Sequence, residues 1–191
     1  MKKLGLVLIL TLVATLGLGA IAYAQSATVS VDPATQSVEA GQQAVVEIMI
    51  ADVTDLYGAE VSLTFDPTIL AVDSMAAGAF LDEASGTVIS DFDNTAGTVD
   101  YAISLLAPAP AVDGSGVLVS ITFDTLTSGT SQVAIANAIL ADVQGARIEA
   151  TVIDGEVEAT VPPDIPEAST LALLGSGMVG LVAFARRKLG K

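Results

Sequence analysis

Apolar and polar residues alternate along most of the chain between residues 25 and 160. In the segment 59–65 every second residue is a larger apolar one, ending at Phe65, and the segment 117–123 repeats this pattern up to Phe123. Successive side chains of a β-strand point to opposite faces, so alternation over seven residues predicts a half-buried strand. We therefore expect both phenylalanines to point into a core.

The same pattern predicts nine short strands, separated by turns rich in Gly, Asp, Pro and Ser. The ninth can break at Asp154-Gly155. Each strand offers one apolar stripe to a shared core, which favours an all-β fold of two packed antiparallel sheets, a sandwich rather than a barrel. The expected strands are 28–31, 44–51, 58–65, 69–73, 87–92, 98–105, 116–124, 132–140 and 150–160.

The N-terminal end has the pattern of a secretory signal peptide. Lys2 and Lys3 precede an apolar run, and Ala22 and Ala24 flank Tyr23 in the small-x-small arrangement that signal peptidase requires. Residues 1–24 are therefore expected to be removed after export. The alternative is an uncleaved N-terminal anchor helix.

A second apolar segment lies close to the C-terminus. Prolines interrupt regular structure in 162–169, and the apolar run 171–185 follows, ending in the basic cluster 186–188. Basic residues after an apolar helix suit the cytoplasmic face of a membrane. At about 1.5 Å per residue the run spans only about 22 Å of a hydrocarbon core about 30 Å thick, so it predicts a marginal transmembrane helix.

This tail resembles the PEP-CTERM sorting signal of bacterial envelope proteins. The residues that carry the resemblance are Pro166, Glu167 and Ala168, the Gly-rich apolar run and the Arg-Arg-Lys cluster. The resemblance implies that an exosortase, a membrane transpeptidase, recognises and removes the tail. Ala168 stands where that family has a second proline, so a permanent, slightly short C-terminal anchor is the alternative.

Charge and composition exclude several function classes. Residues 25–167 hold all 22 acidic residues and one cation, Arg147, a net charge of −21. Such a segment repels nucleic acid and anionic lipid, and favours solubility, divalent cations or a basic partner. The chain has no cysteine and no histidine, which removes disulfides, thiolate chemistry and the commonest general base. Only a carboxylate pair is left for catalysis, and we predict no catalytic residue and no enzyme activity.

Two further ligand classes receive little support from the sequence. The segment 91–97 begins like a calcium loop, but Ala96 replaces the required glycine and Ala102 the final glutamate. We expect an ordinary turn, no metal site and no cofactor beyond weak calcium binding to surface carboxylates. Tyr101 is predicted to be core, which leaves Tyr57 and Phe80 as aromatic residues on which a sugar could stack.

The order of motifs in the exported segment resembles a cohesin domain. A Val-Glu-Ala-Gly-Gln turn at 38–42 precedes the second strand, Phe65-Asp66-Pro67 ends the third, and a Gly-x-Leu-x-x-Ile-x-Phe strand occupies 116–123. The resemblance implies a nine-stranded jelly-roll sandwich that acts in protein–protein contact. In that family one sheet face docks a calcium-loaded helical dockerin module, within complexes that degrade polysaccharides.

The cohesin topology would place strands three, five, six and eight in one sheet with an exposed outer face. On this face we expect a partner-binding surface formed by Glu60, Ser62, Thr64, Asp91, Asp93 and Asp100. An acidic face favours a cationic protein partner. The predicted organisation is a signal peptide (1–24), a cohesin-like domain (25–161), a linker with the sorting motif (162–169) and a membrane helix with a basic tail (170–191).

The expected function is docking or adhesion at the cell envelope, by a protein that is membrane-anchored or released after processing of its tail. Two alternatives are a direct carbohydrate-binding module and a structural protein of the envelope or biofilm matrix.

Overall fold

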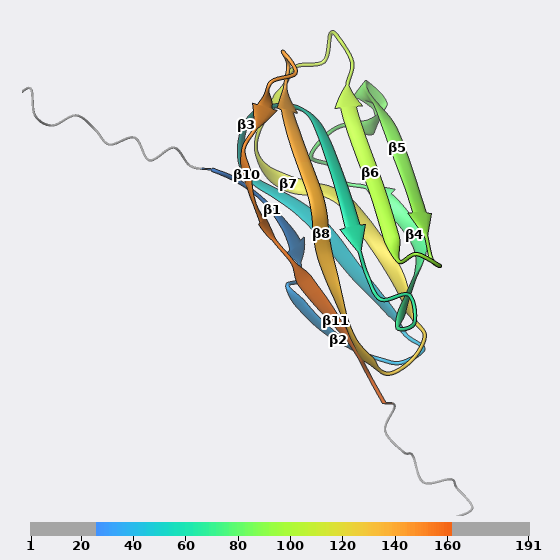
Figure 1. Cartoon of the computed structure of the whole chain (residues 1–191). Coiled ribbons are helices and arrows are strands. Elements are labelled where there is room, and N and C mark those ends of the chain that lie inside the picture. Colours follow the sequence, from blue (N-terminus) through green and yellow to red (C-terminus); the bar gives the residue numbers. More distant parts are fainter. Residues whose placement is uncertain (1–25, 162–191) are drawn as a thin grey trace, which may run out of the picture.

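The computed structural model describes residues 26–161 as two stacked layers of β-strands (Figure 1). The expectations for the signal peptide, including Ala22 and Ala24, and for the sorting motif at Pro166, Glu167 and Ala168 concern residues outside this range. Among the described residues, no helix is both long and apolar enough to cross a membrane.

One layer faces the viewer in Figure 1 and contains strands from all parts of the domain. Its hydrogen-bonded order is β5 (Gly86–Asp93), β6 (Thr98–Leu105), the second half of β3 (Gln43–Thr64), β8 (Gly129–Asp142), β11 (Gly155–Thr160) and β2 (Thr35–Glu39). The two-residue strand β9 (Arg147–Ile148) pairs with β8, and a short 3-10 turn, η1 (Glu83–Ser85), precedes β5.

The second layer lies behind the first. Its order is β10 (Ala150–Ile153), β1 (Ala27–Asp32), the first half of β3, β7 (Val112–Thr125) and β4 (Leu70–Ala77). All pairs in this layer are antiparallel except β1 with β10. The predicted all-β sandwich is therefore confirmed.

Strand β3 belongs to both layers because it crosses between them at a sharp corner. Asp52 and Asp55 adopt left-handed backbone conformations there, with φ of 59° and 60°. Aspartate is among the few residues other than glycine that tolerate this region. The first residues of β7 fix the corner: Asp52 N–H donates to Ser115 Oγ at 2.9 Å and Asp55 N–H donates to Asp113 Oδ1 at 2.7 Å. Two predicted strands, 44–51 and 58–65, are thus joined into one.

The strand count differs from the predicted nine, because the described residues form eleven strands. Besides the joined β3, the ninth strand does break at Asp154, and β2 and β9 were not predicted. β2 has no fully buried residue, so it lacks the apolar alternation that identifies a strand. The sheets are antiparallel except at two edges, where β10 pairs in parallel with β1 and β2 pairs in parallel with β11.

The core fills the space between the layers and contains the predicted inward residues. Phe123 is completely buried, and its ring meets that of Phe65 edge to face at a centroid distance of 5.2 Å. Tyr101 is buried as well, as expected from its alternation on β6. Burial of one face in each layer fixes the strand registers, because a slip of one residue would expose the whole apolar stripe. The outer faces therefore present a defined set of side chains.

Candidate functional site

The candidate site is the outer face of β8, β3, β6 and β5, which we call the front face. The cross-strand register brings the predicted polar residues together on it, in three adjacent rows. Ser62 is opposite Asp100, and Asp100 is opposite Asp91 on the edge strand. In the next row Thr64 and Asp93 both flank Thr98, and Glu60 lies one row away on the other side of Ser62. The predicted residues thus form one contiguous surface.

The row that contains Asp91 and Asp100 concentrates negative charge without a cation beside it. The two aspartates face each other directly across β5 and β6, an arrangement that costs stability because like charges repel. Ser62 Oγ donates to Asp100 Oδ1 at 2.6 Å, which holds that carboxylate in place. Arg147, the one cation of residues 26–161, instead lies 3.8 Å from Glu149 on the far side of β8.

The Asp93 carboxylate accepts hydrogen bonds from the turn that follows β5. Its Oδ1 accepts hydrogen bonds from the backbone N–H groups of Thr95 at 2.7 Å and Ala96 at 3.0 Å. The hydrogen bond from Ala96, followed by that from Thr95, lowers the pKa of the Asp93 carboxyl below its usual value of 3.8. Gly97 closes the turn with φ of 70° and its N–H donates to the Asp93 carbonyl. The segment that begins like a calcium loop is therefore an acidic turn between two strands.

This turn predicts a pH dependence. A lowered folded-state pKa means that the Asp93 carboxylate stabilises the fold above the unfolded pKa, and that this stabilisation is lost as the pH falls through the folded value. We expect Asp93→Asn to lower the thermal unfolding midpoint at neutral pH, with the difference from wild type shrinking from about pH 5 to about pH 2. Unfolding followed by circular dichroism measures this, and a difference that is independent of pH would contradict it.

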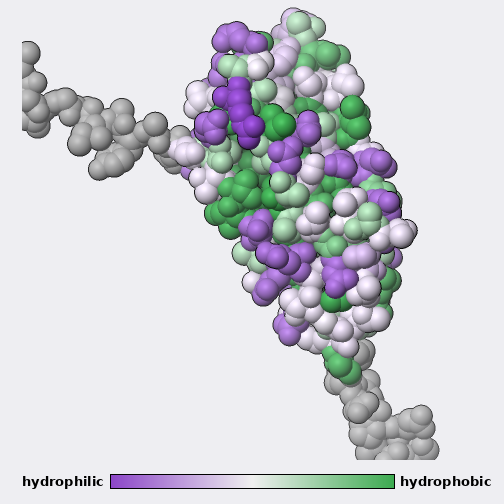
Figure 2. Space-filling model, in the orientation of Figure 1, coloured by the Kyte–Doolittle hydropathy of each residue, from purple (hydrophilic) through white to green (hydrophobic). Residues whose placement is uncertain are grey.

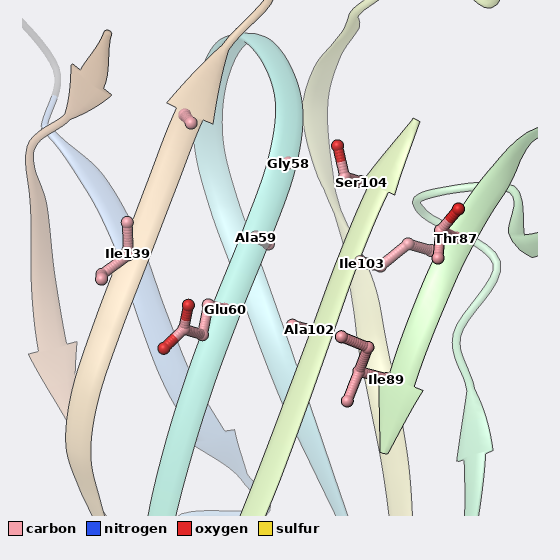
Figure 3. Close-up of a pocket in the computed structure, with 10 residues that line it drawn as sticks. Gly58, Ala59, Glu60, Thr87, Ile89, Ala102, Ile103, Ser104 and Ile139 are labelled. Atoms are coloured by element: carbon pink, nitrogen blue, oxygen red, sulfur yellow. The ribbon is translucent and has the colours of Figure 1, made fainter. Parts of the chain in front are cut away.

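The other end of the front face holds an apolar hollow with a volume of about 310 Å³. Its floor consists of small residues on the two central strands, Gly58 on β3 with Ala102 and Ser104 on β6 (Figure 3). Ile139 on β8 and Ile89 on β5 lie on either side of this floor, and 66% of Ile89 is exposed. Together, Ile89 and Ile139 give this end of the front face an aliphatic surface.

The alternation of apolar and polar residues does not predict this hollow, because the outward position of Ile139 depends on an irregularity in β8. Val133 and Ile135 point into the core, so strict alternation would also bury Ile139. The pairing of β3 with β8 instead shifts by one residue between Ile135 and Asn137. After this bulge Leu140 is buried and Ile139 points outward. The adjacent pair Ile139-Leu140 was the available signal, since both cannot face one side of a strand.

The front face combines acidic, hydroxyl and aliphatic side chains. Figure 2 shows it with hydrophobic and hydrophilic residues interspersed among many of intermediate hydropathy. Within residues 26–161 no group of three or more acidic side chains is arranged to hold a metal ion. Tyr57 and Phe80 are half-buried and pack against the core, so neither forms a flat exposed platform for a sugar ring.

Both the domain and the C-terminal tail match known families. The sequence model of the cohesin domain matches residues 27–159, and the PEP-CTERM protein-sorting motif matches residues 164–188. The chain belongs to the cohesin-domain family. Its tail carries the sorting motif, which implies an exported protein of the cell surface. No protein with a curated description is similar enough to match this cohesin.

Similar solved structures share the fold at low sequence identity. The third cohesin of ScaC from Acetivibrio cellulolyticus, solved in complex with the ScaB dockerin, is 20% identical with a TM-score of 0.63, over 71% of this chain and 99% of that one. The CaDoc0917–CaCohA2 complex contains a chain 19% identical with a TM-score of 0.64, over 71% and 100%. A non-cellulosomal cohesin from the archaeon Archaeoglobus fulgidus is 12% identical with a TM-score of 0.60, over 71% and 91%.

Proposed function

We propose that this protein is a non-catalytic docking module of the cell surface, whose cohesin domain binds a protein partner through its front face. The observation that carries the proposal is the grouping of Ser62, Asp91 and Asp100 with the hollow at Ile89 on one exposed face. Two facing carboxylates without a cation lower the stability of an isolated domain. A partner that covers the carboxylates and the neighbouring aliphatic side chains is the best explanation for their presence on one face.

The partner that fits is a dockerin-like module with basic residues on its contact surface. Similar cohesins were solved in complex with dockerins. The archaeal relative is described as non-cellulosomal, so a cohesin domain does not require a cellulosome. We assign any role in polysaccharide binding or breakdown to the docked partner, because Tyr57 and Phe80 are packed against the domain's own core.

The sorting motif supports delivery of this domain to the cell envelope. We propose that an exosortase recognises Pro166 and Glu167 and removes the tail in spite of Ala168, which releases the domain or transfers it to another surface component. Before that step the apolar segment after Ser169 would hold the protein in the membrane. Intact-mass measurement of the protein from cell envelopes tests this, since a C-terminus that still ends at Lys191 would exclude processing.

Capture from the producing cells tests the docking function. The full-length chain, purified in a mild detergent and immobilised, is expected to retain a protein with a dockerin-like module, and to release it between about 50 mM and 500 mM salt because the contact is charged. The double substitution Asp91→Lys and Asp100→Lys should abolish retention.

The matched control reverses a similar acidic pair on the other layer. Asp32 and Glu47 face each other across β1 and β3 on its outer face, so Asp32→Lys with Glu47→Lys changes the net charge equally. Retention should survive this control. Loss of the partner from both variants would indicate a general charge effect, and binding to insoluble polysaccharide that survives the front-face variant would reject the docking function.

A further inference from the structure

The chain leaves the domain at one end of the sandwich, which we call the C-terminal pole. Four turns meet there, those that join β2 to β3, β3 to β4, β5 to β6 and β7 to β8 (Figure 1). Backbone hydrogen bonds tie the turns to the last strand and to one another: Ala40 N–H donates to the Thr160 carbonyl, Leu126 N–H to the Ile69 carbonyl and Phe65 N–H to the Gly97 carbonyl. The pole is therefore one connected surface.

The last residue that the domain holds before the tail is Thr160. Its carbonyl accepts the bond from Ala40 N–H at 2.8 Å, and its Oγ1 donates to the Val38 carbonyl at 3.2 Å. The next residue, Val161, is 73% exposed. The tail therefore starts from a fixed point on the pole.

The sorting motif follows this point after a very short spacer. The match to the motif begins at residue 164, and Pro166 lies six residues beyond Thr160. A chain spans at most about 3.3–3.6 Å per residue, so Pro166 lies within about 22 Å of Thr160 however the tail runs.

An enzyme that cuts at this motif also has to hold the residues beside it. Holding Pro163, Asp164 and Ile165 would bring the surface of the enzyme within about 11 Å of Thr160. A folded protein of only 100 residues already has a radius of gyration of about 13 Å. The enzyme is thus wider than the spacer is long, so the two folded bodies have to touch.

We propose that the enzyme that removes the tail works in contact with the C-terminal pole, so that the four turns form part of the surface that this enzyme must fit. This inference rests on the proposed removal of the tail and specifies where the enzyme meets the domain. Leu126, which is 52% exposed in the turn between β7 and β8, offers an aliphatic side chain to the contact. The hollow of the front face stays free, because it lies at the other end, where Gly58 pairs with Ser104.

Insertion of one small folded domain into either of two turns tests the contact. Strand β8 runs from the pole to the opposite end of the sandwich, so the turns before and after it lie at opposite ends. One variant of the full-length chain carries the insertion between Thr127 and Ser128, at the pole. The matched control carries it between Gln144 and Gly145. All four residues are exposed, and insertions are tolerated best at exposed turns.

The pole insertion is expected to slow removal of the tail in the producing cells by about tenfold or more, because the motif no longer reaches the enzyme in the productive geometry. The control insertion should leave the rate unchanged. About twelve Gly and Ser residues added between Val161 and Pro162 extend the root-mean-square reach by about 20 Å, and should restore removal in the pole variant. Pulse-chase labelling with intact-mass measurement gives the rates, and circular dichroism shows whether each variant folds.

A second variant leaves the domain itself unchanged. Deletion of Pro162 and Pro163 shortens the spacer by about 7 Å at full extension, which presses the enzyme against the pole and should also slow removal of the tail. A deletion variant processed at the rate of the unaltered chain would contradict the contact, whether or not the insertion variants fold.

The outcomes separate this inference from the proposed removal of the tail. Equal rates in the pole and control variants, or a pole variant that the longer spacer does not rescue, would overturn the contact while leaving the processing step in place. An unaltered chain that keeps its C-terminus at Lys191 would reject the processing step, and the contact with it.

Discussion

Phe123→Ala is expected to lower the free energy of unfolding by about 3–5 kcal/mol, the usual cost of removing a buried aromatic ring. Phe123 lies on the interior strand β7, between β3 and β4, with none of its surface exposed, and its ring meets Phe65 edge to face. The substitution removes the contact with both layers and leaves a cavity that the rigid strands cannot close. Urea unfolding of the full-length chain, followed by far-ultraviolet circular dichroism, measures the loss.

The matched control is a phenylalanine that contributes little to the core. Phe92 lies on the edge strand β5 and is 43% exposed, so Phe92→Ala should cost about 1 kcal/mol or less. Equal losses in the two variants would contradict the assignment of Phe123 to the centre of the sandwich. Such a result would mean that the apolar stripe of β7 does not lie between the layers.

The period of the apolar residues was sufficient to predict the fold class. Val61, Leu63 and Phe65 are buried as their alternation required, and so are Val119, Ile121 and Phe123. Burial of every second residue is a local property, since each strand must present one stripe to the core whatever its neighbours are. The same reasoning placed Glu60, Ser62 and Thr64 on an outer face, because they alternate with the buried residues of the strand.

The connections between strands could not be predicted in this way. The corner at Asp52 and Asp55 depends on hydrogen bonds to Ser115 and Asp113, about sixty residues further along the chain. Alternation says nothing about such contacts. β2 was missed for a related reason: its pairing with β11 supplies hydrogen bonds at the edge of a sheet, and needs no buried side chains of its own.

The candidate site was predicted in part for the same physical reasons. Its acidic residues could be located because they lie on the regular strands β3, β5 and β6, where alternate side chains point to opposite faces of the sheet. The hollow could not, because it needs the β8 bulge that turns Ile139 outward and the pairing that brings Ile89 alongside Ala102. A contact surface built across four strands depends on register, and register is a property of the assembled sheet.

The floor of the hollow consists of small residues, and enlarging one of them is the change with the largest expected effect on binding. Ala102→Trp should weaken binding of the partner by about 100-fold or more, because an indole ring would occupy the space between Ile89 and Ile139 that the partner must enter. Ala102 is half-buried on the outer face of β6, and aromatic residues are favoured on strands. The free energy of unfolding should therefore change by less than about 1 kcal/mol.

The matched control for Ala102→Trp is Ala71→Trp, at a half-buried alanine on the outer face of β4 in the other layer. Both variants carry the same added ring and the same charge, so a nonspecific effect of tryptophan would appear in both. Surface plasmon resonance with the partner captured from the producing cells gives the two dissociation constants, and urea unfolding gives the two stabilities. If Ala102→Trp binds as tightly as Ala71→Trp, the partner does not enter the hollow, because a ring at its floor would have to displace any side chain seated between the two isoleucines.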